Sequence, residues 1–280
     1  MTRRSSIELK SAEQIVKMRS AGLVVARTLQ VVQDAARPGI TTAELDALAR
    51  EEIAAAGAVS SFLGYGGGFG LPPFPAVTCI SVNSEIVHGI PGDRVLADGD
   101  LVSVDFGVSL AGWHGDSAVT FAIGTASAEA AELSETTREA MWAGIAAARI
   151  GGRIGDIGAA VEASIRSRRK GYGIVAEYTG HGIGTAMHQP PDVPNLGRAG
   201  RGELLAKGIC LAVEPMVTAG AASTATLDDE WTVVTRDGSL AAHWEHTIAL
   251  TPAGVWVLTA ADGGEAELRS RGVKFGPLAD

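Results

Sequence analysis

The sequence predicts an α+β fold made of two related helix-helix-sheet units. Two helical segments precede a group of strand-like segments, and this order then occurs a second time along the chain. Two short alignments also relate the halves: RPGITTAEL resembles GGRIGDIGA (Ile40 to Ile154, offset 114), and GDLVSVDFGV resembles GICLAVEPMV (Asp105 to Glu214, offset 109). The nearly equal offsets favour a duplication with a pseudo-twofold axis that brings Asp105 and Glu214 near each other.

The first unit begins with two amphipathic helices. Ser11 and Gln14 form a capping box, and apolar residues then recur every three or four positions. This apolar face consists of Ile15, Met18, Gly22, Val25, Leu29 and Val32. Thr41 and Glu44 form a second capping box, and Gly57 is suited to end that helix. The strand-like runs VTCISV, LVSVDFGV and DSAVTFAI follow.

The second unit has the same order. Residues 127–149 and 156–169 are expected to form helices, and ICLAVEPMV, WTVVT and HTIALT are expected to form strands. The segment GGGFGLPPF, between Tyr65 and Pro75, is expected to be a loop because its glycines and prolines do not sustain a helix or a central strand. The tail from Ala261 is rich in glycine and charge, and we expect it to be loosely ordered.

We therefore expect a single domain over residues 1–260, with halves at about 11–125 and 126–260, and a C-terminal tail over 261–280. With 280 residues, of which 46% are hydrophobic and 20% charged, the chain can bury a substantial core.

The charge and the composition exclude several classes of function. A net charge of −9 argues against a general affinity for nucleic acid, and the basic run Arg166–Lys170 is expected to be a solvated helix end. The N-terminus has no apolar signal region and no run of 18 apolar residues occurs, so we expect a soluble, cytoplasmic protein without a membrane partner. Cys79 and Cys210 lie in apolar strand-like runs and are expected to be reduced core thiols.

The segment VDFGVSLAGWHGD is typical of a hairpin that carries one carboxylate in each strand, Asp105 and Asp116. If the turn centres between Leu110 and Ala111, the two acids lie opposite each other, with Cβ atoms about 4.5–5.5 Å apart. Like charges in this position destabilise a hairpin, so solvent, a shared proton, an Arg or Lys, or a metal cation must offset the repulsion.

Three further groups lie in surroundings that are unusual for solvated charges: His181 in TGHGIGTAMH, Glu214 in LAVEPMV and Glu245 in WEHTIALT. Taken singly, each is explained by a structural role such as a buried ion pair. Together with Asp105 and Asp116 they make four carboxylates and one imidazole with no matching cation nearby in the sequence. That set is typical of sites for divalent Mn, Fe, Co or Zn, and two ions about 3.5–4 Å apart would let two of the carboxylates bridge.

The chain resembles the type I methionine aminopeptidases, which have the pita-bread fold. The resemblance extends from about Ser11 to Pro252 and rests on five motifs in order: SVNSEIVHGIPG, DGDLVSVDFGVSLAGWHGDSAVTF, GHGIGTAMHQPP, LAVEPM and WEHTIALT. It implies duplicated units around a curved antiparallel sheet. It also implies a cytoplasmic, monomeric enzyme that acts at the ribosome on nascent polypeptide N-termini and removes the initiator methionine when the second residue is small.

The resemblance assigns roles residue by residue. It makes Asp105 a chelating ligand of the first of two divalent ions (Co, Mn, Fe or Zn), and Asp116 and Glu245 bridging ligands. His181 and Glu214 complete the second ion. A bridging water would attack the scissile carbonyl, with Glu214 as the general base.

The resemblance also implies the residues that contact substrate. His188 would hydrogen-bond the developing oxyanion, and His88 would contact the peptide beyond the scissile bond. The pocket for the methionine side chain would consist of Tyr65, Cys79, Met187 and Trp231. An ordinary core role is the alternative for these residues, and it is least natural for Trp231, which has polar neighbours. The remaining histidines within the motifs are expected to alternate away from the ligands and either to be structural or to support the ligands from outside the metal site: His114, His243 and His246.

Three departures from the family pattern concern the pocket. The loop GGGFGLPPF is about six residues longer than usual, so we expect it to reshape the pocket mouth or to form a lid. Val87 stands where many bacterial members have Cys, and Met187 stands where an aromatic residue is common.

Two alternatives have the same fold. The Xaa-Pro peptidases share part of DFGVSLAGW, but they usually carry a large additional N-terminal domain, and WHGD and MHQPP favour the methionine enzyme. A metal-free pita-bread binding protein would have lost metal ligands, whereas all five are present here.

Overall fold

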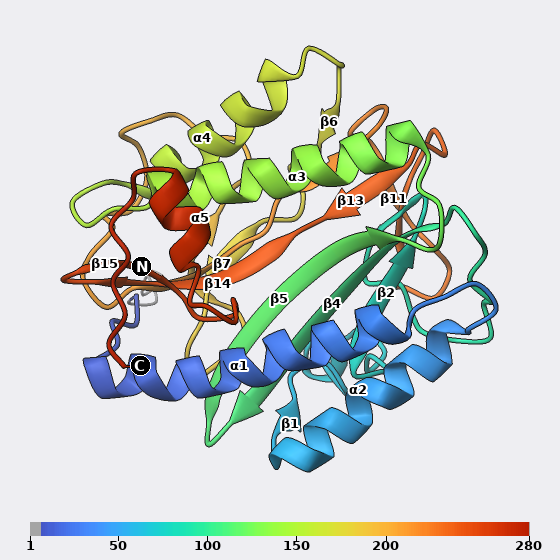
Figure 1. Ribbon diagram of the computed structural model, residues 1–280, viewed down its shortest axis with the longest axis horizontal. Helices are drawn as coiled ribbons and strands as arrows, with labels where there is room; N and C mark the ends of the chain where they lie inside the picture. Colours follow the sequence, from blue (N-terminus) through green and yellow to red (C-terminus); the bar gives the residue numbers. More distant parts are fainter. Residues whose placement is uncertain (1–6, 280) are drawn as a thin grey trace.

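The computed structural model describes residues 7–279, and the first six residues of the predicted domain lie outside this range, as does residue 280. Five helices are present among the described residues: α1 (Ala12–Ala35), α2 (Thr42–Ala56), α3 (Ala128–Ala147), α4 (Ile154–Ser167) and α5 (Glu265–Ser270). Figure 1 shows α1 and α3 crossing the same face of a curved sheet. The predicted α+β class is confirmed.

The main sheet contains nine strands within the described part of the chain, and all of its pairings are antiparallel. Its order is β1 (Val59–Ser60), β4 (Leu101–Leu110), β5 (Trp113–Ala122), β14 (Glu245–Thr251), β9 (Cys210–Val213), β7 (Gly180–Gly182) and β8 (Gln189–Val193). Two further strands pair beside this path, β2 (Thr78–Val82) with β4 and β15 (Gly254–Val257) with β14. The two halves of the chain therefore meet where β5 pairs with β14.

Two small sheets flank the main one. The first has the order β13 (Ala241–His243), β10 (Met216–Thr218) and β6 (Gly173–Ile174). The second has the order β11 (Thr224–Thr226), β12 (Val233–Thr235) and β3 (Glu85–Val87). A short 3-10 helix, η1 (Gly67–Phe69), lies within the segment predicted to be a loop.

The predicted duplication is visible in matching hydrogen bonds ahead of α2 and α4. The backbone N–H of Gly39 donates to the carbonyl of Leu96 at 2.8 Å, and the N–H of Gly151 donates to the carbonyl of Leu205 at 2.9 Å. In each half the N-cap residue of the helix also forms an antiparallel bridge, Thr41 with Val95 and Arg153 with Leu204. The two helix pairs are thus attached to the sheet in the same way.

The first two helices begin where the sequence predicts, whereas α3 begins one residue later and α4 two residues earlier than predicted. Ser11 and Gln14 exchange the two hydrogen bonds of a capping box at the start of α1, and Thr41 and Glu44 do so at the start of α2. All six apolar positions predicted for the first helix are buried. Gly57 ends α2 in the left-handed conformation, with φ of 62°, which glycine adopts without steric cost.

Alternation along the strands separates the apolar core from the acids. Val102, Val104 and Phe106 of β4 belong to a cluster with α1 and α2, so Asp105 faces the opposite side of the sheet. In β14, Ile248 packs in the cluster that contains α3 and α4, and Glu245 therefore also faces away from the helices. Both acids face the side of the sheet that the helices leave uncovered.

The predicted hairpin register is wrong by two residues. Leu110 pairs with Trp113 across a two-residue turn in which Ala111 and Gly112 have φ of 50° and 80°. Twisted antiparallel strands favour such a turn because its twist matches their own. Asp105 consequently pairs with Ala118, and Asp116 pairs with Gly107. A shift of two positions preserves the face, so the two acids are diagonal neighbours on one side of the sheet.

The expectation that the tail is loosely ordered is also wrong. Leu268 of α5 is fully buried, and Val273 and Phe275 pack against the same apolar cluster. Three apolar side chains among glycines and charges are enough to attach this segment to the core. The domain boundary at residue 260 stays a prediction.

The thiol prediction is confirmed, because Cys79 and Cys210 are buried and unpaired. Across residues 7–279, no helix has both the length and the apolar composition needed to cross a membrane.

Candidate metal centre

One cavity brings together every residue that the sequence analysis assigned to a site. Its lining includes the five predicted metal ligands, Asp105, Asp116, His181, Glu214 and Glu245. It also includes the residues predicted to contact substrate, His88, His188, Tyr65, Cys79, Met187 and Trp231. The residues come from both halves of the chain, so the cavity lies at their junction.

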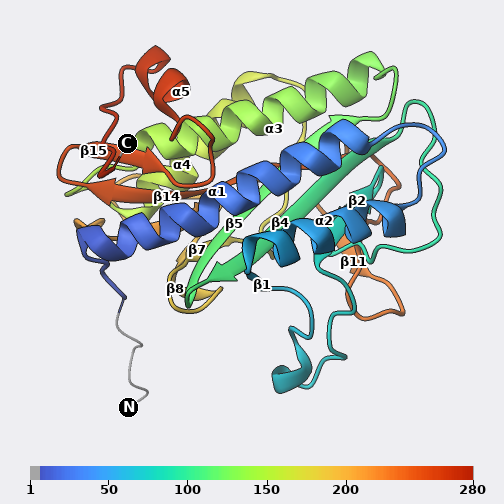
Figure 2. The same cartoon turned by 60° about the horizontal axis from the view of Figure 1, so that its bottom comes forward.

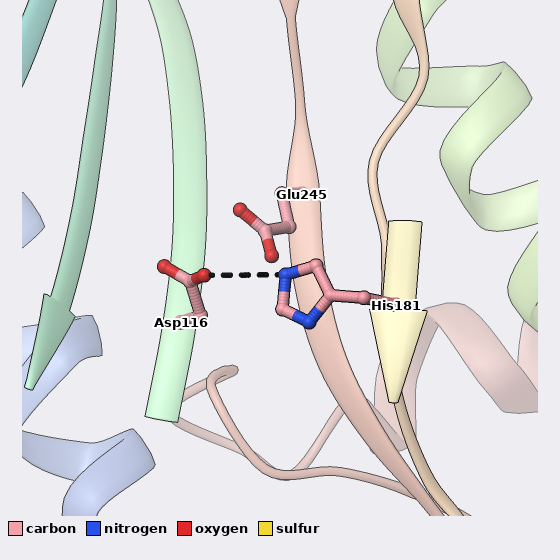
Figure 3. Close-up of side chains that lie close together, drawn as sticks. All are labelled: Asp116, His181 and Glu245. Carbon is pink, nitrogen blue, oxygen red and sulfur yellow. Dashed lines mark ion pairs between the residues drawn. The ribbon is translucent and has the colours of Figure 1, made fainter. Parts of the chain in front are cut away.

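Three strands supply one cluster of possible ligands. Figure 3 shows Asp116 on β5, Glu245 on β14 and His181 on β7 with their side chains directed toward one another. One ligand atom from each lies within 4.8 Å of the others, and His181 Nε2 is 3.7 Å from Asp116 Oδ2. The three groups can therefore surround a single ion.

Glu214 lies between two imidazoles. It follows β9 directly, and its backbone carbonyl accepts a hydrogen bond from Asn195 Nδ2 at 3.2 Å. Its Oε1 is 3.5 Å from His181 Nε2, and its Oε2 is 3.5 Å from His243 Nε2. Both carboxylate oxygens thus point into the cluster.

Burial perturbs all four carboxyl groups, and repulsion by Asp116 adds to its effect in the other three. Burial raises the pKa values of Asp105, Glu214 and Glu245 well above their ordinary range, and the neighbouring Asp116 raises each of them further. Burial also raises the pKa of Asp116 to about 7. Burial, followed by the nearby His188, lowers the pKa of His181 to about 3, so its imidazole is neutral and able to bind a metal. The cluster needs protons or a cation to offset its charge.

The residues present fit a divalent cation. Asp105 Oδ1, Asp116 Oδ1 and Glu245 Oε1 are buried and have no hydrogen-bond partner within residues 7–279. No Lys or Arg is among the described residues that line the cavity, so neither side chain offsets the negative charge of the carboxylates there. Carboxylate oxygens together with imidazole nitrogen are a donor set for Mn, Fe, Co and Zn.

The remaining cavity residues form a pocket beside the cluster. His188 Nδ1 is 2.7 Å from the Tyr65 hydroxyl, and the His188 ring lies 4.3 Å from that of His181. His88 packs edge-on against Trp231, with ring centroids 6.0 Å apart. Cys79 and Met187 are buried in the lining. The pocket thus has an aromatic and sulfur-containing wall next to the possible ligands.

The loop GGGFGLPPF, residues 66–74, contacts this wall. Trp231 Nε1 donates a hydrogen bond to the Pro72 carbonyl at 2.9 Å, and the Trp231 ring packs edge-on against Phe74 with centroids 5.3 Å apart. Gly66, with φ of 88°, lies against the same indole. Figure 2 shows this segment extending from the sheet after β1. The long loop therefore shapes the pocket by fixing Trp231.

Of the three histidines predicted to be structural or to support the ligands from outside the site, His243 is placed differently. His114 Nδ1 is bonded to Ser61 Oγ at 2.8 Å, and His246 Nδ1 is 2.9 Å from Thr259 Oγ1. His243 instead lines the cavity beside Glu214, so the expectation that it turns away from the ligands is wrong. A spacing of two residues before Glu245 places it on the same face of an extended chain, which is the signal that predicts this position.

The chain matches metallopeptidase family M24 over residues 16–252. The chain belongs to this family. Among its relatives in family M24, methionine aminopeptidase 1 from Mycobacterium tuberculosis is 49% identical over 261 residues, which cover 91% of this chain and 96% of that protein. The predicted resemblance is thereby confirmed.

Solved structures of family M24 proteins confirm the pita-bread fold. Methionine aminopeptidase from Thermotoga maritima superposes with a TM-score of 0.86 at 38% identity, covering 91% of this chain and all of that one. An X-Pro aminopeptidase from Thermotoga maritima superposes with a TM-score of 0.69 at 22% identity, covering 90% of this chain and 62% of that one. The second likeness shows the shared fold alone.

Proposed function

We propose that this protein is a methionyl aminopeptidase that removes the N-terminal initiator methionine from nascent proteins whose second residue is small. The observation that carries the proposal is the single cavity in which a cluster of four carboxylates and an imidazole adjoins an apolar, sulfur-containing pocket. A flexible thioether side chain matches such a wall. The M24 family membership and the methionine aminopeptidase relatives support the same activity.

The proposed centre is dinuclear and takes Co, Mn, Fe or Zn. Its ligands are Asp105, Asp116, His181, Glu214 and Glu245. Bound there, divalent ions would lower the pKa of a water molecule toward neutrality and polarise the substrate carbonyl.

Glu214 acts as the general base in this proposal. Its carboxylate lines the cavity between two imidazoles and accepts the proton of the attacking water. The same group then passes that proton to the leaving amine. Burial raises the pKa of this carboxyl group above its ordinary range, and a raised pKa makes the carboxylate a stronger base toward the attacking water.

His188 stabilises the oxyanion, and His88 contacts the peptide beyond the scissile bond. When the Tyr65 hydroxyl donates to His188 Nδ1, the ring proton resides on Nε2, which then donates to the developing negative charge. Burial, followed by the nearby His114, lowers the pKa of His188 to about 4, so the ring is a neutral donor at working pH. The methionine side chain occupies the wall formed by Tyr65, Cys79, Met187 and Trp231.

The proposal includes a cytoplasmic setting, a monomeric state and action on nascent chains at the ribosome. The substrate is a nascent N-terminus, so the ribosomal exit is the place where it first becomes accessible. The net charge of −9 supports the absence of a general nucleic-acid partner.

Hydrolysis of two peptides tests the activity. With Mn²⁺ or Co²⁺ present, we expect cleavage of Met-Ala-Ser, no cleavage of Ala-Pro-Ala, and loss of activity after chelation. Cleavage of Ala-Pro-Ala alone would identify an Xaa-Pro peptidase instead. Activity that is indifferent to the chelator would exclude the metal centre.

A further inference from the structure

His243 occupies a rigidly held position at the edge of the acidic cluster. It pairs with Met216 in the ladder between β13 and β10. Its backbone N–H donates to Thr120 Oγ1 at 3.0 Å, and its carbonyl accepts from the same hydroxyl at 2.6 Å. The residue is 1% exposed. The backbone of His243 is thus fixed, and its imidazole is enclosed by the surrounding protein.

The imidazole nitrogen that points into the cluster has no protein partner. His243 Nε2 is buried and makes no hydrogen bond within residues 7–279. Leaving a buried polar atom unpaired costs free energy, so a partner outside the described protein atoms is expected.

The surroundings of this nitrogen repeat those of His181. Each histidine has Nε2 at 3.5 Å from one oxygen of Glu214, His181 from Oε1 and His243 from Oε2. One ligand atom each from Glu214, His243 and Glu245 lies within 4.8 Å of the others, as in the cluster of Asp116, His181 and Glu245. The two clusters share Glu245.

The distance of 3.5 Å between His243 Nε2 and Glu214 Oε2 indicates what kind of contact these atoms make. It exceeds the usual N–H···O distance of about 2.7–3.2 Å. Two atoms that each lie about 2.1 Å from one ion, at an angle of about 110°, are separated by about 3.4 Å. The spacing is therefore that of two ligands of a common ion rather than that of a hydrogen-bonded pair.

We propose that His243 Nε2 is a sixth ligand of the divalent-metal centre, which it joins together with Glu214 and Glu245. This inference rests on the metal centre proposed above. Imidazole favours Co and Zn over Mn, whereas carboxylates alone suit Mn. A second imidazole should therefore shift the preference of the centre toward Co and Zn. The competing explanation is that His243 only donates a hydrogen bond to Glu214 and positions it.

A direct bond between metal and nitrogen distinguishes these explanations. The full-length protein with ¹⁵N-labelled histidine is loaded with ¹¹³Cd²⁺, and scalar splitting of the imidazole nitrogens is recorded by NMR. We expect two split Nε2 signals, from His181 and His243. Splitting at His181 alone would overturn the assignment of His243 while leaving the centre intact. Splitting at no histidine would overturn the proposed centre itself.

Variants supply the assignment and a second measurement. His243→Gln should remove one split signal and lower the Co²⁺ affinity, measured by calorimetry, by more than the about 10- to 100-fold that loss of an outer partner of a ligand costs. Its Mn²⁺ affinity should fall less. His114→Gln is the matched control, because its ring is bonded to Ser61 outside the cavity lining, and its Co²⁺ affinity should not change. Equal Co²⁺ affinities in His243→Gln and the wild type would count against ligation. If His243→Gln fails to fold, the number of split signals in the wild type still decides.

Discussion

Glu214 combines two properties at the scale of a single residue. Its side chain is almost fully buried, and both of its oxygens face imidazole nitrogens rather than backbone donors. A carboxylate in this position contributes little to holding the fold and much to the chemistry of the cavity, because burial without hydrogen bonds costs free energy.

Glu214→Gln should reduce kcat for Met-Ala-Ser by about 10²- to 10⁴-fold, since an amide accepts no proton from the attacking water. Far-UV circular dichroism should be unchanged, because Gln has nearly the same shape. The His114→Gln variant serves as the control for substitution near the site. Turnover retained by Glu214→Gln would refute its role as general base.

Asp116 makes the stability of the metal-free protein depend on pH. Its folded-state pKa of about 7 lies above the ordinary 3.8, so the folded protein binds a proton that the unfolded chain has released between these values. Its contribution to stability is therefore fully present below about pH 4 and is lost as the pH rises through 7.

Asp116→Asn removes this dependence. With a chelator present, the variant should have a larger free energy of unfolding than the wild type at pH 8. This difference between the two proteins should be about 2–3 kcal/mol smaller at pH 5, because one pH unit corresponds to about 1.4 kcal/mol. Urea unfolding at both pH values measures this difference. The neighbouring carboxyl groups change it in the same direction, because their pKa values fall when the charge of Asp116 is removed. A difference that does not vary with pH would contradict the raised pKa.

The location of the five acidic and imidazole residues in one cavity could be predicted from the sequence because each is surrounded by apolar or glycine-rich segments. The position of His243 in the cavity was harder to predict from the sequence. The histidine is the last residue of β13, and one residue separates it from the first residue of β14. This break between two sheets hides the strand alternation that relates His243 to Glu245. The unpaired Nε2 becomes visible only when the packing around it is known.

At the scale of elements, sequence predicted the helices more closely than the β4–β5 turn. Capping boxes fix a helix start by side chains only three residues apart, so α1 and α2 begin as predicted. The hairpin turn depends on Ala111 adopting φ of 50°, which an alanine side chain does not signal. The tail was mispredicted for a related reason, because its order depends on contacts of Leu268 with distant strands.

The long loop offers a test of how an element controls the pocket. A Cβ on Gly66 would lie 2.5 Å from the Trp231 ring, whereas a Cβ on Gly70 would meet nothing within 4 Å. Both glycines have positive φ, of 88° and 84°, so both alanine variants bear similar backbone strain. Only Gly66→Ala must also displace the indole.

Gly66→Ala should therefore raise KM for Met-Ala-Ser about tenfold relative to Gly70→Ala, equivalent to about 1.4 kcal/mol of lost contact. Steady-state kinetics of the two variants measure this. Equal KM values would mean that the loop does not fix the pocket through Trp231.

At the scale of the whole molecule, the cavity depends on the junction between the duplicated halves. Asp105 and Asp116 come from the first half, and the other three proposed ligands come from the second. The pairing of β5 with β14 holds them together, with Glu245 opposite Ala118. An ion bound there would join the two halves. Its attraction for each buried carboxylate would also offset the repulsion among them.

Metal should therefore stabilise the entire fold. A ligand of the folded state at about 100 times its Kd adds about 2.7 kcal/mol. For a chain of this size, with Tm changing by about 2–4 °C per kcal/mol, Co²⁺ or Mn²⁺ added to the chelator-treated protein should raise Tm by about 5–10 °C. Differential scanning calorimetry measures the shift, and an Asp116→Asn, Glu245→Gln double variant should lose it. A wild-type Tm unchanged by either metal would mean that the buried carboxylates are compensated by protons alone.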